Sequence, residues 1–164
     1  MNTGQMLMTI GALVLLSTLF LRVNTSYLHN STTSNKSKFE ILAASLANSV
    51  IEEASDKAFD NNTVDNSATD FSQLTLPDSL GVDDGDEYPN FNDIDDYNGF
   101  TKTDSTLPSA IFHLSCTVNY VSQLNPDVIS LTRTWTKKIT VMVTSPSMSD
   151  TVKLSSLFCY WAFR

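Results

Sequence analysis

The N-terminal segment is the feature that most limits what this chain can be. The first 21 residues carry no charged side chain, and residues 6–21 (MLMTIGALVLLSTLFL) are almost wholly apolar. An α-helix rises about 1.5 Å per residue and a bilayer core is about 30 Å thick, so a membrane span needs roughly 20 apolar residues. Residues 4–23 reach that length. We therefore expect a helix that lies in a membrane, or against apolar surfaces that replace a membrane.

Two interpretations of this segment follow from its residues. A secretory signal peptide has a basic N-terminal region and a cleavage site with small residues, whereas residues 1–5 contain no Lys or Arg and Arg22-Val23-Asn24 is a poor cleavage sequence. An uncleaved single-pass anchor needs neither feature, so the first 24 residues favour the anchor.

The charges that flank the segment and the composition of the chain give opposite indications of orientation. Lys and Arg occur only after the apolar run, as Arg22, Lys36 and Lys38, and a count of such charges favours a domain in the cytoplasm. The chain is also rich in Asn, Ser, Thr and Asp, which is typical of exported bacterial proteins. About 140 residues follow the span, enough for one modest domain. The net charge of −8 argues against nucleic acid as a partner for that domain, since phosphates repel a negatively charged protein.

The two cysteines are candidates for a disulfide. Cys116 and Cys159 lie in β-rich runs, and an even number of cysteines in an exported domain fits one bond. Such a bond would close a loop of about 43 residues, which the chain-entropy model values at about 4 kcal/mol. The alternative is two buried free thiols.

A polar segment and a second helix are predicted after the span. Residues 24–37 are mostly Asn, Ser and Thr, which loosen helices, so we predict a flexible or partly melted linker. Ser37 and Glu40 then form a capping box at the start of an amphipathic helix over residues 38–58. Its apolar positions repeat with helical spacing: Phe39, Leu42, Ala43, Leu46, Ala47, Val50, Ile51, Ala54 and Ala58.

An acidic loop is predicted over residues 60–100. It has no periodicity and no Lys or Arg, and residues 83–96 hold seven carboxylates. A connection of this length is usually functional or disordered. Scattered apolar residues predict that it packs down: Phe71, Leu74, Leu76, Leu80, Tyr88, Phe91, Ile94, Tyr97 and Phe100.

The last third of the chain alternates as β-strands do. Apolar residues share one face over residues 112–120, 129–144 and 152–160, with turn-like sequences near residues 126 and 147. Three strands joined by short turns predict an antiparallel meander, and one helix on its face would bury both apolar surfaces. The expected fold class is α+β: a long apolar N-terminal helix and an amphipathic helix packed on a C-terminal antiparallel sheet.

This layout resembles that of type IV pilins and of the pseudopilins of type II secretion systems. Three blocks carry the resemblance: residues 91–100 (FNDIDDYNGF), residues 135–143 (WTKKITVMV) and residues 152–157 (VKLSSL). The resemblance implies a pilin-like globular domain over residues 38–164. It also adds a third interpretation of the N-terminus, a leader of residues 1–4 cut between Gly4 and Gln5 by a prepilin peptidase.

The resemblance further implies partners and a location. Residues 5–23 would be a transmembrane helix that later packs on other pilin-like subunits in a filament core. The domain would lie in the periplasm on a single-pass inner-membrane helix, or outside the cell after assembly. Two features depart from the family, since the leader has no basic residue and Thr9 stands where the fifth mature residue is usually Glu. Thr9 cannot neutralise a neighbour's terminal amine, which favours a minor or tip-located subunit.

The sequence offers little catalytic chemistry. Neither His29 nor His113 has a partner at metal or triad spacing, and we expect no enzyme. The acidic loop is the one candidate for a cofactor, because Ca²⁺ takes six to eight oxygen ligands from flexible acidic loops. The candidate ligands are Asp83, Asp84, Asp86, Glu87, Asp93, Asp95 and Asp96. The alternative is a solvated loop whose Asp residues cap turns.

The sequence thus predicts a structural subunit of a pilus-like or pseudopilus-like filament. The alternative is a permanently anchored envelope protein whose domain binds a partner or an ion.

Overall fold

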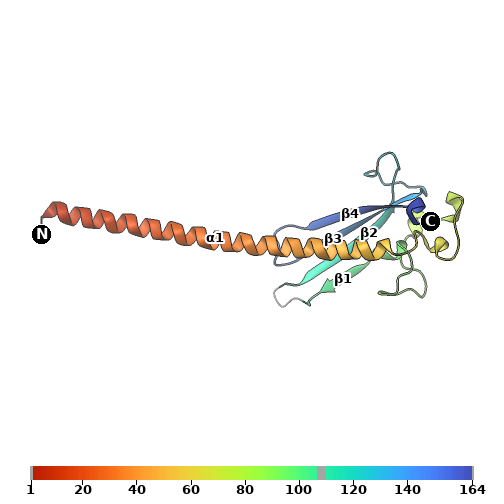
Figure 1. Ribbon diagram of the computed structural model, residues 1–164, viewed down its shortest axis with the longest axis horizontal. Coiled ribbons are helices and arrows are strands. Elements are labelled where there is room, and N and C mark those ends of the chain that lie inside the picture. The colour runs from red at the N-terminus through yellow and green to blue at the C-terminus, as the bar shows by residue number, and fades with distance from the viewer. Residues whose placement is uncertain (1, 107–109, 164) are drawn as a thin grey trace. The chain divides into compact units, whose positions relative to one another are not determined.

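The computed structural model describes residues 2–106 and 110–163 and contains one long helix and one sheet (Figure 1). The chain divides into two compact units, Met1–Lys38 and Phe39–Arg164. Helix α1 covers Thr3–Ser55, and the strands are β1 Thr101–Asp104, β2 Phe112–Tyr120, β3 Thr136–Thr144 and β4 Val152–Cys159. Short 3₁₀ turns complete the elements: η1 Asn61–Thr63, η2 Phe71–Gln73, η3 Pro77–Ser79, η4 Asp95–Tyr97 and η5 Tyr160–Phe163.

The polar segment over residues 24–37 is helical, so the prediction of a flexible linker is wrong. Its threonine hydroxyls donate to helix carbonyls three or four residues back. Thr25 donates to the carbonyls of Leu21 and Arg22, and Thr32 and Thr33 both donate to that of His29. A hydroxyl bonded in this way no longer competes for other backbone groups. The helix therefore continues through Ser37, which is not an N-cap.

The part of α1 in the second unit packs against the sheet. Its buried residues are Ala43, Ala47, Val50 and Ala54, spaced by three or four positions as predicted. The helix ends three residues before the predicted end. Beyond it, the Ala58 N–H donates to the carbonyl of Asn92 over 3.1 Å.

The sheet has the order β1-β2-β3-β4, with every neighbouring pair antiparallel. Strand β2 alternates as predicted, with five side chains buried toward the helix: Phe112, Leu114, Cys116, Val118 and Tyr120. Strand β3 contributes Ile139, Val141 and Val143 to the same core. The predicted α+β class is confirmed.

Two parts of the sheet differ from the prediction. Strand β1 was not predicted, because residues 101–104 (TKTD) lack apolar alternation. The strand predicted over residues 129–144 begins only at Thr136, and Leu131 is 88% exposed. The Thr134 hydroxyl donates to the carbonyls of Val121 and Thr136 and closes residues 122–135 into a loop. Ile129 forms only an isolated antiparallel bridge with Val121, so residues 129–144 are not one continuous strand.

The acidic loop packs down on the core in part as predicted, although two of the expected anchors, Phe71 and Leu76, are exposed. Leu74, Phe91, Ile94 and Tyr97 are buried. The Ile94 N–H donates to the carbonyl of Ala58 over 3.0 Å, so the loop is hydrogen-bonded to the residues that follow the helix. The later part of the loop, around Ile94, is thereby held beside the residues that follow α1.

Candidate functional site

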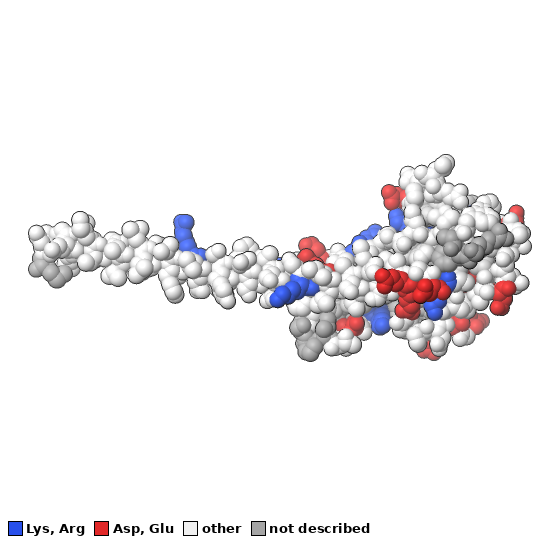
Figure 2. Space-filling view, in the orientation of Figure 1, with Lys and Arg blue, Asp and Glu red and all other residues white. Residues whose placement is uncertain are grey.

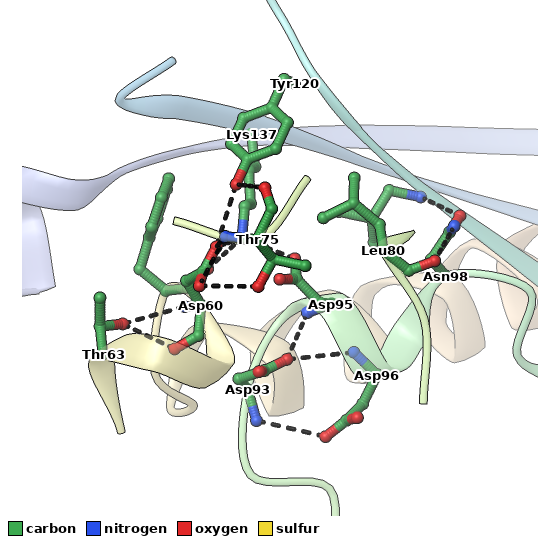
Figure 3. A network of polar contacts seen from close by, with 12 residues as sticks. Asp60, Thr63, Thr75, Leu80, Asp93, Asp95, Asp96, Asn98, Tyr120 and Lys137 are labelled. Carbon is green, nitrogen blue, oxygen red and sulfur yellow. Dashed lines mark hydrogen bonds and ion pairs between the residues drawn. The ribbon is translucent and has the colours of Figure 1, made fainter. Parts of the chain in front are cut away.

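A buried lysine connects the acidic loop to the sheet (Figure 3). Lys137 comes from the core-facing side of β3 and has no exposed surface. Its Nζ lies 2.8 Å from Asp60 Oδ2, 2.6 Å from Asp95 Oδ1 and 2.8 Å from the carbonyl of Phe59. These three acceptors match the three protons of an ammonium group. One side chain thus joins β3, the start of the loop and turn η4.

Of the two carboxylates that contact Lys137, Asp60 accepts more hydrogen bonds than Asp95. It accepts hydrogen bonds from the backbone N–H and the hydroxyl of Thr75, and from the hydroxyl of Tyr120 at 3.0 Å. Burial raises its pKa, but Lys137 and the Thr75 donors outweigh burial and hold the pKa below its usual value. Asp60 therefore carries the negative charge that balances Lys137.

Asp93 and Asp95 both have pKa values that are raised toward neutral pH. Burial raises the pKa of Asp95 to about 7 against the opposing effect of Lys137. Burial and the neighbouring Asp95 and Asp96 raise the pKa of Asp93 to about 8. Oδ2 of each is buried without a hydrogen-bond partner among the described residues. Asp93 Oδ1 accepts from the N–H groups of Asp95 and Asp96 at 2.6 and 3.1 Å, which fixes turn η4.

A second group of carboxylates lies at the other side of the loop. Oxygens of Asp83, Asp86 and Asp96 all lie within 4.8 Å of one another. Asn92 connects two of them, because its backbone N–H donates to Asp96 Oδ2 and its side-chain amide donates to Asp86 Oδ2 at 2.6 Å. Burial, followed by Asp96 and Asp86, raises the pKa of Asp83.

The structure separates the seven predicted calcium ligands. Asp83, Asp86 and Asp96 come together, whereas Asp95 contacts Lys137 and Asp93 holds turn η4. The remaining two, Asp84 and Glu87, are exposed. Calcium binding stays a prediction, and its candidate ligands narrow to three carboxylates, which would need carbonyl or water oxygens to reach six.

The predicted disulfide is not formed, and both cysteines are free in the described part of the chain. Cys116 lies on β2 and Cys159 on β4, with β3 between them. Strands lie about 4.8 Å apart, so these strands are about 10 Å apart, beyond the roughly 7 Å that a disulfide spans between Cα atoms. The side chains also take opposite faces, since Cys116 is buried and Cys159 follows the inward-facing Phe158.

Sequence reasoning missed the central residue of the site. Lys137 occupies an inward position between Trp135 and Ile139, in a strand whose other inward residues are apolar. A lysine at such a position, in a chain with a surplus of carboxylates, signals a buried ion pair. Its partners Asp60 and Asp95 are 77 and 42 residues away, a distance that no local pattern reveals.

The predicted processing residues lie in the first turn of α1. Gly4 and Gln5 follow directly after Thr3, where the helix begins, and the Gln5 N–H donates to the carbonyl of Asn2 at 2.9 Å. Cleavage after Gly4 stays a prediction.

His113, on the outer face of β2, pairs only with the Thr103 hydroxyl among the described residues.

The N-terminal part of α1 exposes its apolar side chains on every side. Leu13, Leu16 and Phe20 are each more than 60% exposed, and the most apolar window of the helix has no buried residue. This segment is long and apolar enough to span a membrane, although a signal sequence or the core helix of a soluble protein meets the same criterion. Figure 2 shows the acidic side chains over the second unit, and residues 3–38 of α1 contain no Asp or Glu.

A long apolar N-terminal helix followed by a small antiparallel sheet is compatible with a pilin-like fold. Comparison of the chain with protein-family models, with curated proteins and with solved structures found no match.

Proposed function

We propose that this protein is a structural subunit of a pilus-like or pseudopilus-like filament, in the periplasm or outside the cell. One observation carries the proposal: residues 6–21 form a helix whose large apolar side chains have no partner within the described chain. Both lipid and the same helix of other copies can cover such apolar side chains. The helix can therefore be stored in the inner membrane and later packed into a filament core.

The well-packed core of the domain and its fastened loop support the same function. Its core is formed by the last part of α1 and the sheet, and its acidic loop is fastened by a saturated lysine. The three blocks that resemble pilin-like proteins correspond to the tightly held parts: turn η4 with its flanks, strand β3 and strand β4. A rigid domain on an apolar helix is suited to assembly, and we propose no catalytic role for it.

A minor or tip position fits the N-terminal chemistry. If the chain is cut after Gly4, Thr9 becomes the fifth residue, and its hydroxyl donates to the carbonyl of Met6 at 2.8 Å. A hydroxyl satisfied in this way offers no charge to a neighbour's terminal amine. Partners would be other pilin-like subunits through the N-terminal helix, with a prepilin peptidase as the processing enzyme.

The mature N-terminus tests this proposal. We expect mass spectrometry of the protein from its native membranes to find a chain that begins at Gln5, with a methylated amine as added support. A Gly4→Leu variant should keep Met1 and fail to enter filaments, while a Gly11→Leu variant, which leaves the cut site intact, should be processed normally. A native chain that begins at Met1 would contradict the filament model.

The alternative function is a permanent envelope anchor whose domain binds a partner or an ion. The basic residues Arg22, Lys36 and Lys38 that follow the apolar run favour a helix end held at a membrane surface. Full retention in the membrane with Met1 in place would support this alternative.

A further inference from the structure

The two borders of the sheet differ in length and protection. Strand β1 borders one side with four residues, and β4 borders the other with eight (Figure 1). A border strand presents unpaired N–H and C=O groups, which another strand can bind. Natural proteins protect such borders by keeping them short or by adding charges, prolines or bulges.

The hydrogen-bond pattern shows which residues of β4 point outward. The Tyr160 N–H donates to the carbonyl of Trp135 at 3.0 Å, in line with the register that pairs Cys159 with Thr136. In an antiparallel ladder, hydrogen-bonded pairs alternate with pairs that are not hydrogen-bonded. The even-numbered residues of β4 therefore bond to β3, and Lys153, Ser155 and Leu157 direct their backbone groups away from the sheet.

The same reasoning applies to β1. The Cys116 N–H donates to the carbonyl of Phe100 at 2.9 Å, next to the register pair of Thr101 and Ser115. Thr101 and Thr103 therefore direct their backbone groups outward. No hydrogen bond from any other described residue reaches these outward groups of β1 or β4.

The border of β4 is open to pairing. It contains no proline and no glycine, and Lys153 is its only charged residue. Ser155 is exposed and Leu157 is 47% exposed. Val152 and Leu154 face the core but are only partly buried, so an added strand would cover them further. Strand β1 is protected against pairing because it is short, whereas the longer β4 has neither a short length nor prolines.

The direction of the strands selects the strand that fits. Three antiparallel steps separate β1 from β4, so the two borders run in opposite directions. A neighbouring copy in the same orientation therefore presents β1 antiparallel to β4. Pairing of β4 with β4 of a second copy would instead require the two copies to face in opposite directions.

We propose that the β4 border of one copy binds the β1 border of the next copy, so that their sheets continue head to tail. The contact would join the outward backbone groups of Ser155 and Leu157 to those of Thr101 and Thr103. On the outer face of this contact, the hydroxyl side chains of Ser155, Thr101 and Thr103 lie near one another, and no like charges meet. This proposal rests on the filament function. A head-to-tail contact between different borders can repeat from copy to copy without closing into a ring only when all copies share one orientation, as they do in a filament.

Cross-linking of the full-length chain in its native membranes tests the contact. The background is Cys159→Ser. The remaining Cys116 is buried, and burial raises its pKa to about 12, so it stays unreactive at pH 7.5. Thr103→Cys and Ser155→Cys together should give a ladder of dimers and larger species with a short bismaleimide, because each copy carries both borders. The pair Thr101→Cys and Leu157→Cys covers the neighbouring register.

The controls separate the possible contacts. Thr103→Cys with Thr117→Cys places the second thiol on the exposed face of the central strand β2 and should give no ladder. Adding Leu157→Pro to the Thr103→Cys/Ser155→Cys pair removes an outward N–H but leaves the hydrogen bonds between β4 and β3 in place. The yield of cross-linked species should therefore fall several-fold. Ser155→Cys alone should give no dimer. A dimer from that single variant, or no ladder from either double variant, would overturn the proposal.

The mature N-terminus, read in the same samples, separates this proposal from the filament function. Processed chains without either cross-link would contradict the sheet contact alone. Cross-linked chains that still begin at Met1 would contradict the filament function alone.

Discussion

The two parts of α1 have the same backbone but different side chains. Residues 3–38 carry large exposed apolar groups and contain no Asp or Glu. Residues 39–55 bury alanines at the positions that face the sheet, and every one of the 18 acidic residues of the chain lies at or beyond Glu40. One helix thus combines a segment whose large apolar side chains are exposed with a segment that packs into the domain core. Side-chain size and charge, rather than helix propensity, distinguish the two.

We expect the largest effect from a substitution that lowers the stability of the domain and does not touch the N-terminal segment. Lys137→Met would leave Asp60 and Asp95 buried without their cation, which should cost about 3–5 kcal/mol of unfolding free energy. Urea unfolding of the detergent-solubilised full chain would measure the loss. Lys138→Met is the matched control, since Lys138 pairs with the exposed Asp127 and should cost less than about 1 kcal/mol. Equal losses in the two variants would contradict the central role of Lys137.

A charge in the N-terminal segment should affect membrane insertion and leave the stability of the domain unchanged. Leu13→Arg replaces an apolar residue near the middle of the predicted span, at a cost of about 3–4 kcal/mol for insertion. We expect the variant to be lost from carbonate-washed membranes, with the thermal unfolding of its domain unchanged. Ser31→Arg, in the polar part of the helix, should stay in the membrane. Retention of the Leu13→Arg variant would argue against a span at this position.

Calcium should stabilise the domain if the three-carboxylate cluster binds it. At ten times the dissociation constant, Ca²⁺ would add about 1.4 kcal/mol and raise the melting temperature. Asp86→Asn should abolish this increase, whereas Asp84→Asn, at an exposed position of the same loop, should preserve it. An unchanged melting temperature in both excess calcium and excess chelator would remove calcium from consideration.

The buried carboxyl groups predict a dependence on pH. The pKa values of Asp93, about 8, and Asp95, about 7, lie above the unfolded value of 3.8, so the folded state binds more protons between these limits. Stability from these groups is complete below pH 4. It is lost as the pH rises toward 7 for Asp95 and toward 8 for Asp93, by at most about 1.4 kcal/mol per pH unit for each group. The lowered pKa of Asp60 acts oppositely, and its contribution is lost only below pH 4.

Unfolding measured from pH 5 to pH 9 would show this slope. Asp93→Asn keeps a neutral side chain of the same shape and should flatten the curve and raise stability at pH 8. Asp84→Asn, on an exposed carboxylate, should leave the slope as it is. A slope that persists in Asp93→Asn at full size would assign the dependence to Asp95 or to another group.

The fold followed from the sequence wherever burial is periodic. The alternation in β2 and the spacing of Ala43, Ala47 and Val50 both reflect one face against one core. Strand β1 has no such face, since its place depends on pairing with β2 rather than on its own residues. The helix over residues 24–37 was missed because composition does not reveal whether a threonine hydroxyl bonds within its own helix.

The site was predictable only in part. The acidic loop was identified, but seven carboxylates of one type divide into three environments that depend on contacts distant in sequence. Asp95 is buried beside Lys137 whereas Asp84 is exposed, a difference that the local sequence does not show. The cysteines show the same limit, since their strands are separated by β3, and a strand order is not visible in either local sequence.

The saturated ammonium of Lys137 has a consequence for the way the domain opens. It binds the carbonyl of Phe59, the carboxylate of Asp60 and that of Asp95, so it fastens the helix end, the loop and the sheet at one atom. The loop cannot detach without exposing all three. Its amides near Ile94 should therefore exchange with solvent deuterium as slowly as those of β3, through opening of the whole domain, although the chain there has the length and composition of a mobile loop.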